Sequence, residues 1–317
     1  MERIFVMTGA TSGMGLQLAR NLAQNSGVHL IIGARTPASA HVLQRLVPAN
    51  RLTLLELDLA NLASVTRFCK QAIEAVGSKA ALDAIVCNAG LQIVDGPRMT
   101  ADGVEMTFAA NHLGHFLLVH GLLPMVRQDG LVVTTASGTH DPNDPLARTF
   151  GFRGGIFPSA EAVARGELDA SADPLQQGKD RYATSKLCNI LFIKEMARRG
   201  ENGSVRFLAF DPGLMPGTGL ARDYSAIQRF GWTYLLPMLR FVFSGVSSAE
   251  KSANAYAQLL QSRAPDLESG AYIDFRLRAI APSDDAFRAD LSKELYRVSC
   301  DLCGSELAAV SRLAISA

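Results

Sequence analysis

The chain has 317 residues, 48% of them hydrophobic, so it is long enough to bury a large core. Lysine plus arginine number 31 and aspartate plus glutamate number 30, which gives a formal net charge of +1. This balance excludes a general electrostatic attraction to nucleic acid or to an anionic membrane surface. We therefore expect one large domain over 1–317 that recognises a small molecule through a local site.

The start of the chain and its cysteines favour a cytoplasmic location. The opening MERIFVMTGA leads directly into a glycine-rich motif and has no pattern of a cleavable signal segment. The cysteines are scattered and odd in number, which favours free thiols in a reducing compartment. They are Cys69, Cys87, Cys188, Cys300 and Cys303.

Two short motifs could suggest a metal, but neither is complete. Cys300 and Cys303 form one CxxC pair without a second pair or a nearby histidine cluster. His112 and His115 are three residues apart in a helical pattern, with no third ligand apparent. We expect no metal site, and we interpret both histidines as core or supporting residues.

Apolar runs typical of strands alternate with stretches of helical periodicity. Seven strands are expected, at 3–8, 28–33, 52–57, 84–87, 131–136, 205–210 and 271–274. Helices are expected between most of them, including 14–24, 62–76, 104–126 and 182–199. Because parallel strands need crossover connections, this order predicts a single doubly wound α/β domain with a seven-stranded parallel sheet and helices on both faces.

Two segments interrupt this alternation. The first, at about 139–180, is rich in Gly, Pro, Asp and Ala, and it is too long for an ordinary connection, so it is either functional or mobile. The second, at about 214–246, contains an apolar stretch interrupted by Pro237 and Arg240. It is too short to cross a bilayer comfortably, so no transmembrane segment is expected. A substrate lid, a partner-facing helix and a homo-oligomer contact remain open.

A glycine-rich turn follows the first strand, in the sequence TGATSGMG. Glycines 9, 13 and 15 allow a tight turn and a close approach of the backbone to a pyrophosphate, while the N–H groups of the following helix attract its charge. A strand before the turn and a helix after it are the context that a dinucleotide site requires. Residues expected to contact the cofactor here are Gly9, Thr11, Ser12, Gly13, Met14 and Gly15.

The second strand indicates which dinucleotide is bound. It ends in GAR, with Arg35 near the place where folds that prefer NAD carry an acidic residue for the ribose 2′-hydroxyl. A guanidinium group instead suits a 2′-phosphate, so NADP(H) is the expected cofactor. The alternative is that Arg35 is only a solvated charge at a strand end.

Further cofactor contacts are expected where other strands end, since ligands of open α/β sheets bind at the carboxyl edge. Asp58, after the third strand, could accept a hydrogen bond from the adenine amino group. The remaining candidates are Leu59, Asn88, Ala89, Gly90, Pro212 and Gly213.

The motif YATSK places Tyr182 and Lys186 four residues apart, on one face of a helix. A free tyrosine has a pKa near ~10, and an adjacent ammonium group pulls the pKa toward the working pH of a general acid or base. Ser137, after the fifth strand, could donate to the substrate oxygen, and Asn111 could hold a water that relays protons to Lys186. An ordinary helical Tyr/Lys pair and a helix kink at Asn111 are the alternatives.

Taken together, TGATSGMG, NAG, Asn111, Ser137, YATSK and the DPG at 211–213 resemble the short-chain dehydrogenase/reductase family, in the family's order and over nearly the whole chain. The resemblance implies a Rossmann-type sheet and hydride transfer between a nicotinamide and a carbonyl carbon. It implies that Ser137 orients the oxygen and Tyr182 handles the proton. Lys186 would bind the ribose and tune the tyrosine, and Asn111 would complete the relay.

A narrower likeness comes from NHLGHFLL, YATSKLCNILF, PGLMPGTGL and VSSAEKSANAYAQLL, which are similar to light-dependent protochlorophyllide reductases and retinol-dehydrogenase-like enzymes. The 45 positions between Ser137 and Tyr182 fit that branch, since the simplest members of the family have a much shorter spacing. One departure is Leu214, which stands where protochlorophyllide reductases carry a cysteine and which cannot donate a proton.

We therefore expect an NADPH-dependent oxidoreductase that acts on the carbonyl or alcohol of a bulky apolar small molecule. Two alternatives stay open: an enzyme like protochlorophyllide reductase that acts on a tetrapyrrole, and a non-catalytic NADPH-binding sensor or assembly protein. The intact set of Asn111, Ser137, Tyr182 and Lys186 favours an enzyme over the binding protein.

Overall fold

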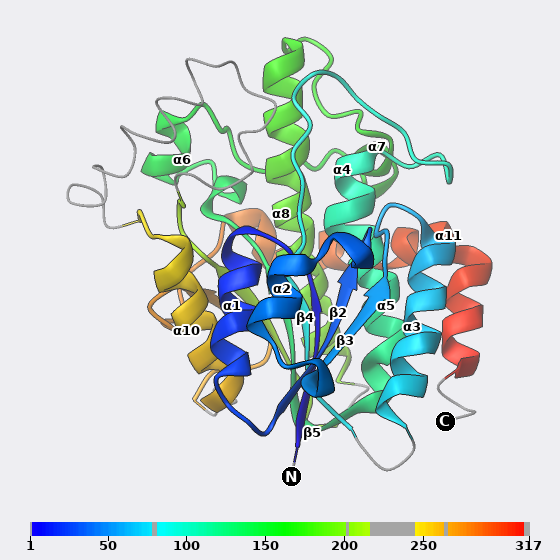
Figure 1. Cartoon of the computed structure of the whole chain (residues 1–317). Helices are drawn as coiled ribbons and strands as arrows, with labels where there is room; N and C mark the ends of the chain where they lie inside the picture. The colour runs from blue at the N-terminus through cyan, green and yellow to red at the C-terminus, as the bar shows by residue number, and fades with distance from the viewer. Residues whose placement is uncertain (1, 78–80, 201–202, 216–244, 263–265, 314–317) are drawn as a thin grey trace.

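A computed structural model describes residues 2–77, 81–200, 203–215, 245–262 and 266–313 (Figure 1). Its centre is a seven-stranded sheet in the order β3-β2-β1-β4-β5-β6-β7, in which every pair is parallel. This confirms the expected α/β class and all seven strands. The strands are β1 (Arg3–Thr8), β2 (Val28–Ala34), β3 (Leu52–Glu56), β4 (Leu82–Cys87), β5 (Val126–Thr135), β6 (Arg206–Asp211) and β7 (Tyr272–Asp274).

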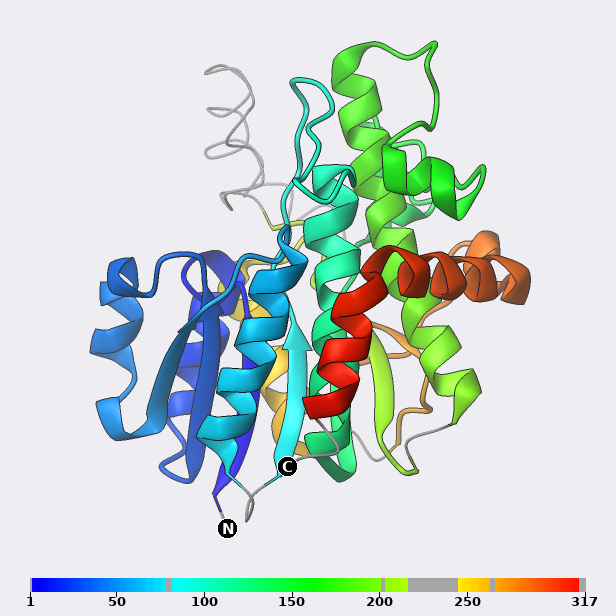
Figure 2. The same cartoon turned by 90° about the vertical axis from the view of Figure 1, so that its right-hand side faces the viewer.

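Helices cover both faces of the sheet, as the alternating pattern predicts (Figures 1 and 2). One face carries α1 (Gly13–Ala23), α2 (His41–Leu46) and α10 (Ala249–Ser262). The other carries α3 (Leu62–Val76), α5 (Gly114–Leu122), α8 (Pro174–Arg199) and α11 (Ala289–Leu313). Shorter helices are α4 (Met106–Phe108), α6 (Pro145–Thr149) and α7 (Ala160–Arg165).

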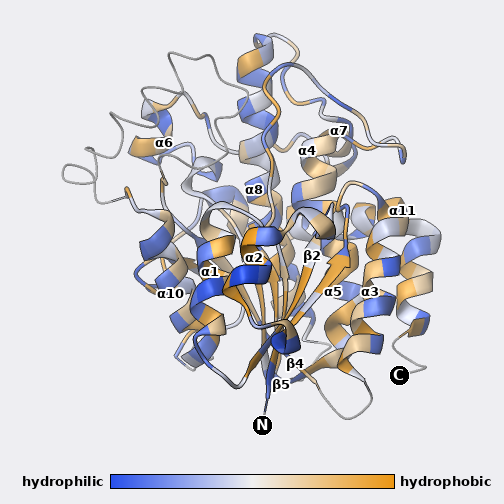
Figure 3. Cartoon of the chain, viewed as in Figure 1, coloured by the Kyte–Doolittle hydropathy of each residue, from blue (hydrophilic) through white to orange (hydrophobic). Residues whose placement is uncertain are grey.

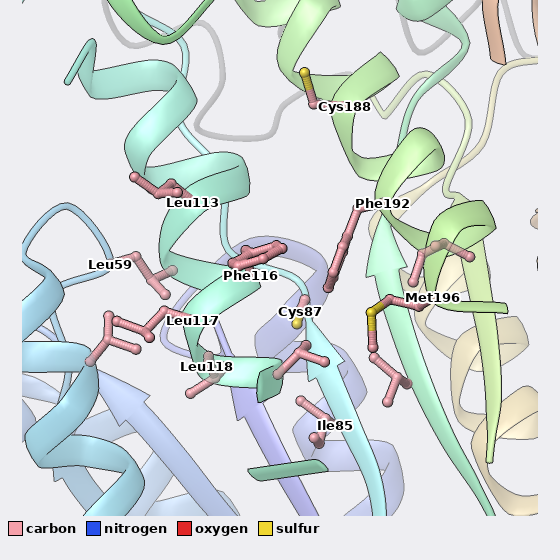
Figure 4. Packing of buried hydrophobic residues seen from close by; sticks show 14 of the residues in the cluster. Leu59, Ile85, Cys87, Leu113, Phe116, Leu117, Leu118, Cys188, Phe192 and Met196 are labelled. Atoms are coloured by element: carbon pink, nitrogen blue, oxygen red, sulfur yellow. The ribbon is translucent and has the colours of Figure 1, made fainter. Parts of the chain in front are cut away.

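Each face of the sheet has its own apolar core, because strands covered by helices on both sides carry apolar side chains on both faces. The strands are accordingly among the most hydrophobic parts of the ribbon, whereas the helices mix both kinds of residue (Figure 3). On the α5 and α8 face, the rings of Phe116 and Phe192 lie with centroids 5.3 Å apart (Figure 4). This packing fixes α8 against α5 and hence the position of the residues that α8 carries.

The expected helix over 104–126 is interrupted. It consists of α4, a π-helical turn at Ala109–Leu113 and α5, and a short 3-10 turn at Leu123–Met125 follows it. β5 then begins at Val126, five residues before the predicted start. The apolar pattern did not reveal this end of the strand because its sequence, RQDG, is polar, and residues 128 and 129 are exposed.

Helix α8 begins at Pro174, eight residues before the predicted start at Tyr182. Asp173 caps it by accepting a hydrogen bond from the Gln176 backbone N–H at 2.9 Å, and proline suits the first helical position. The last residues assigned to the 139–180 insertion therefore belong to a helix. The rest of that insertion forms α6, α7 and connecting loops, and it projects with the start of α8 beyond the sheet (Figure 2).

Most of the expected lid region at 214–246 lies outside the described residues, which end at Met215 and resume at Gly245. The two ends of this region lie side by side. Leu214 N donates to Gly245 O at 3.0 Å, and Ser247 N donates to Leu214 O at 2.8 Å. Within the described ranges, no helix combines the length and the apolar character that a membrane span requires.

Candidate active site

A cavity of about 1290 Å³ lies at the carboxyl ends of the strands, where ligands of open α/β sheets bind. Nearly all of the site residues expected from the sequence line it. They are Gly9, Thr11, Ser12, Met14, Gly15, Arg35, Asp58, Leu59, Asn88, Ala89, Gly90, Ser137, Tyr182, Lys186, Pro212 and Gly213. Gly13 and Asn111 are not among the lining residues of the described chain.

The glycine-rich turn is built by close approach of the backbone. A Cβ atom at Gly15 would lie 2.1 Å from the carbonyl oxygen of Gly9, and Gly9 itself has a φ of +66°. Gly13 has a φ of +57°, with nothing within 4 Å of the position a Cβ would take. The side chain of Ser12 does not cap α1, so the first N–H groups of that helix have no side-chain acceptor from it. This arrangement suits an anion such as a pyrophosphate.

Thr8 and Asn88 hold the glycine-rich turn against the end of β4. The amide of Asn88 donates to the carbonyl oxygens of Thr8 at 3.2 Å and Gly9 at 3.0 Å. The hydroxyl oxygen of Thr8 accepts from the backbone N–H groups of Asn88 and Ala89, each at 3.0 Å. Asn88 therefore supports the cofactor turn in addition to lining the cavity.

His115 extends this network from the turn to Asn111. Its Nδ1 lies 3.0 Å from the carbonyl oxygen of Asn111, which can only accept, so Nδ1 carries the proton. Burial lowers the pKa of His115 to about 4, so the ring is neutral and Nε2 accepts from the Thr8 hydroxyl at 2.9 Å. His115 is thus a supporting residue, as expected. Among the described residues, no group of three or more potential metal ligands occurs.

The second and third strands end at the same cavity. Arg35 follows β2, and its side chain is exposed at the cavity wall. Asp58 follows β3 and turns toward the start of α3: its Oδ1 accepts from Ala60 N at 3.0 Å, and its own N–H donates to Ser64 Oγ at 3.0 Å. These bonds fix the Asp58 carboxylate at the edge of the site.

Tyr182 and Lys186 share the inward face of α8. The Nζ of Lys186 lies 5.5 Å from the centroid of the Tyr182 ring and donates to Thr135 O, at the end of β5, at 3.0 Å. Burial lowers the pKa of Lys186 to about 8, while the nearby carboxylate of Asp211 raises it. A positive charge so close to the ring stabilises negative charge on the phenolic oxygen.

The side chain of Asn111 connects two elements beneath the cavity. Its Oδ1 accepts from Leu91 N at 2.8 Å, and its Nδ2 donates to Leu91 O and to Ser185 Oγ, both at 2.9 Å. Asn111 lies in the π-helical turn, a local distortion that is frequent at functional sites. A Cβ at Gly90 would lie 3.4 Å from Lys186 Nζ and 3.6 Å from Asn111 Oδ1, so both residues border Gly90.

Ser137 lies at the end of β5 beside a buried polar cluster that the sequence did not reveal. Its carbonyl oxygen accepts from His140 Nδ1 at 2.7 Å. Asp211 accepts from the Tyr272 hydroxyl at 2.9 Å and from the Gly213 N–H at 2.9 Å, and its pKa is raised chiefly by burial. Asp211 therefore both shapes the loop at Pro212 and Gly213 and lies close enough to Lys186 to affect its charge.

Other lining residues were also missed. Lys179 lies three residues before Tyr182, on the same face of α8. The capping signal at 173–176 marks the true start of this helix. A prediction based on that signal would have placed Lys179 in the helix and on the face of Tyr182. Phe150 and Phe152 come from the insertion, where no periodic pattern marks them. Thr8 could have been found, since it ends the first strand directly before the glycine-rich turn.

Solved structures of the same fold resemble this one. A putative uncharacterized protein from Mycobacterium paratuberculosis matches with a TM-score of 0.66 and 25% identity, over 95% of this chain and 93% of that one. An NADPH-bound carbonyl reductase from chicken fatty liver matches with a TM-score of 0.63 and 16% identity, over 88% of this chain and 94% of that one. The second likeness shows the fold alone.

Sequence comparisons identify the family. The short chain dehydrogenase model matches residues 3–146. Protochlorophyllide reductase of Avena sativa is 32% identical over 288 residues, covering 85% of this chain and 88% of that protein. Protochlorophyllide reductase B of Hordeum vulgare is 29% identical, covering 94% of this chain and 78% of that protein. With its seven-stranded parallel sheet and its glycine-rich turn, the chain belongs to the short-chain dehydrogenase family.

Proposed function

We propose that this protein is an NADPH-dependent oxidoreductase that reduces bulky apolar carbonyl compounds, or oxidises the matching alcohols. One observation carries the proposal: Tyr182, Lys186 and Ser137 line the same cavity as the glycine-rich turn. A tyrosine with a neighbouring ammonium group and a second hydroxyl can bind and protonate a carbonyl oxygen. The cavity thus combines groups suited to a dinucleotide with groups suited to proton transfer.

The residues present fit a nicotinamide dinucleotide. The turn at Gly9 and Gly15 and the uncapped start of α1 suit the pyrophosphate, and Arg35 suits a 2′-phosphate. Lys186 borders Gly90 and would hold the nicotinamide ribose. When bound, the cofactor supplies the hydride that reduces the carbonyl carbon.

Tyr182 and Lys186 of α8, together with Ser137 after β5, carry out the proton transfer. In reduction, Tyr182 donates its phenolic proton to the substrate oxygen, and Ser137 donates a hydrogen bond to that oxygen and orients it. Lys186 stabilises the phenolate that Tyr182 becomes. In oxidation of the alcohol the proton moves in the opposite direction, so Tyr182, as the phenolate, accepts the proton of the substrate hydroxyl.

An apolar substrate is favoured by apolar side chains in the cavity. Phe152 lies beside Tyr182, with ring centroids 6.1 Å apart, and Leu146, Phe150 and Met215 also line the cavity. Binding of an apolar substrate against these side chains removes apolar surface from water, which stabilises the complex by on the order of 25 cal/mol per Å². Bulky aldehydes and ketones are therefore the class to test.

The substitution Tyr182→Phe tests the proposal. We expect NADPH consumption with bulky apolar ketones to fall by about 10²- to 10⁴-fold, since a general acid contributes on that order. NADPH binding, measured by fluorescence titration, should change little because the ring remains. Near wild-type turnover would refute the proton role, and tight NADPH binding by the wild type without any turnover would favour the binding-protein alternative.

Reduction of a tetrapyrrole is the second candidate, favoured by the 32% identity to protochlorophyllide reductase of Avena sativa. Leu214, directly after Pro212 and Gly213, disfavours a light-driven reaction because its side chain has no proton to donate. Incubation with NADPH and protochlorophyllide, in the dark and under illumination, distinguishes the two. Conversion in light alone, with all carbonyl compounds left unreacted, would make this second candidate the better one.

A further inference from the structure

Lys179 lines the cavity one helical turn before Tyr182. Lys179, Tyr182 and Lys186 are spaced three and four residues apart, so they share one face of α8, and all three line the cavity. At 1.5 Å of rise per residue, Lys179 lies about 4.5 Å further along the helix than Tyr182, on the side of the insertion. A substrate whose carbonyl oxygen meets Tyr182 can therefore reach Lys179 with another part of its body.

The ammonium group of Lys179 has more N–H donors than the one hydrogen bond to Phe150 uses. Its Nζ donates to the carbonyl oxygen of Phe150 at 3.0 Å, whereas an ammonium group carries three N–H donors. Among the described residues, no carboxylate lies within ion-pair distance of it. The acids that line the cavity have other partners: Asp58 and Asp144 accept from backbone N–H groups, Asp211 from Tyr272, and Asp274 from Arg278.

The neighbouring charges of the insertion are paired with one another. Asp180, next to Lys179 in sequence, accepts from the Arg153 guanidinium at 3.2 Å and from Gln176 at 2.8 Å. Arg181 lies 3.6 Å from the buried carboxylate of Glu105. Lys179 thus differs from these neighbours in facing the cavity without an anionic partner in the described part of the chain.

An aromatic surface joins Lys179 to the reacting hydroxyl. The Nζ of Lys179 lies 6.0 Å from the centroid of the Phe152 ring, and that ring lies 6.1 Å from the ring of Tyr182. An apolar substrate that packs on the Phe152 ring could place its carbonyl group at Tyr182 and its other end at Lys179. In this partly apolar setting an ion pair is stronger than in water.

We infer that Lys179 binds a carboxylate carried by an otherwise apolar substrate and so makes the enzyme selective for bulky oxo acids over their neutral counterparts. One ammonium balances one negative charge, which favours a carboxylate over a doubly charged phosphate. The inference rests on the proposed function, because it names the substrate class of the same cavity.

The experiment compares aryl oxo acids with their methyl esters as substrates of the full chain with NADPH. For the wild type we expect a higher kcat/KM with each acid than with its ester. Lys179→Met should lower kcat/KM for the acid by about tenfold to a hundredfold more than it lowers kcat/KM for the ester, since a hydrogen bond to a charged group contributes on that order. Most of this loss should come from a higher KM for the acid. Lys179→Arg, which keeps the charge, should restore the preference for the acid.

A matched control is Lys293→Met, on α11, where an exposed lysine lies away from the cavity. It should leave both rates at the wild-type level. Equal losses with acid and ester in Lys179→Met would mean that Lys179 only holds the Phe150 carbonyl, and the inference would be wrong. Equal wild-type activity on acid and ester would also overturn it while leaving the proposed function intact. Absence of turnover with both would instead count against the proposed function itself.

Discussion

Arg35 is the residue on which the cofactor preference depends. It directly follows β2 at the cavity wall, and a guanidinium group there can form charge-assisted hydrogen bonds with a 2′-phosphate. We expect Arg35→Ala to weaken NADPH binding by about tenfold to a hundredfold, while NADH binding changes little. Fluorescence titration with both cofactors measures this. Equal losses of affinity for NADPH and for NADH would show that Arg35 does not bind the 2′-phosphate.

Most of the site residues predicted from the sequence line the cavity, because strand ends and a glycine-rich turn can be recognised from local patterns. Gly9, Asn88 and Tyr182 are examples. The sequence did not predict the cluster of Asp211, Tyr272 and His140, because these residues are far apart in the chain and only the sheet order brings them together. It also did not predict how the Asn111 side chain is bonded, which depends on the loop at Leu91.

At the scale of elements, the contact between α5 and the loop after β3 positions the floor of the site. Gly114 starts α5, and a Cβ there would lie 2.2 Å from the carbonyl oxygen of Leu59, a residue that lines the cavity. Gly114→Ala should therefore push the helix from the loop and lower the free energy of unfolding by about 1–3 kcal/mol, as overpacking does. It should also weaken NADPH binding.

The control for this prediction is Gly27→Ala, where the new Cβ would meet only the Asn25 side chain at 3.4 Å and φ lies outside the left-handed region. Urea unfolding of both variants gives the comparison. If Gly114→Ala is as stable as Gly27→Ala and binds NADPH equally well, the close approach at Leu59 does not hold the site together.

Element types were predicted better than element ends. The alternation of apolar runs identified all seven strands, because six of them are largely buried and the half-buried edge strand β3 still carries three leucines. The start of α8 was missed because the polar turn at 174–181 carries its helix signal in the cap at Asp173 rather than in apolar periodicity. The π-helical turn at Ala109–Leu113 was missed because a single inserted residue leaves the apolar pattern nearly unchanged.

At the scale of the whole molecule, buried neutral histidines couple stability to pH. Burial lowers the pKa of His112 to about 3 from 6.5, so in acid the unfolded chain takes up a proton that the folded chain does not. The contribution of His112 is fully present above pH 6.5 and is lost as pH falls toward 3. The free energy of unfolding should therefore fall by about 1.4 kcal/mol per pH unit for this residue below pH 6.5.

His112→Phe removes this proton uptake and suits the surrounding rings of Phe108 and Phe192. We expect a smaller loss of stability between pH 7.5 and pH 5 in the variant than in the wild type, measured by urea unfolding at both values. His41→Gln, at an exposed histidine, should keep the wild-type dependence. An unaltered pH dependence in His112→Phe would show that His112 is not buried in its neutral form.

The central claim is that the cavity brings a nicotinamide and a carbonyl compound together for hydride transfer. The most direct test uses NADPH deuterated at nicotinamide C4, on each face in turn, with a panel of bulky apolar ketones and mass analysis of the alcohol product. We expect deuterium from one face only, at the former carbonyl carbon, and almost none of this product with Tyr182→Phe. NADPH consumption without labelled alcohol, or no product from any ketone, would contradict the account.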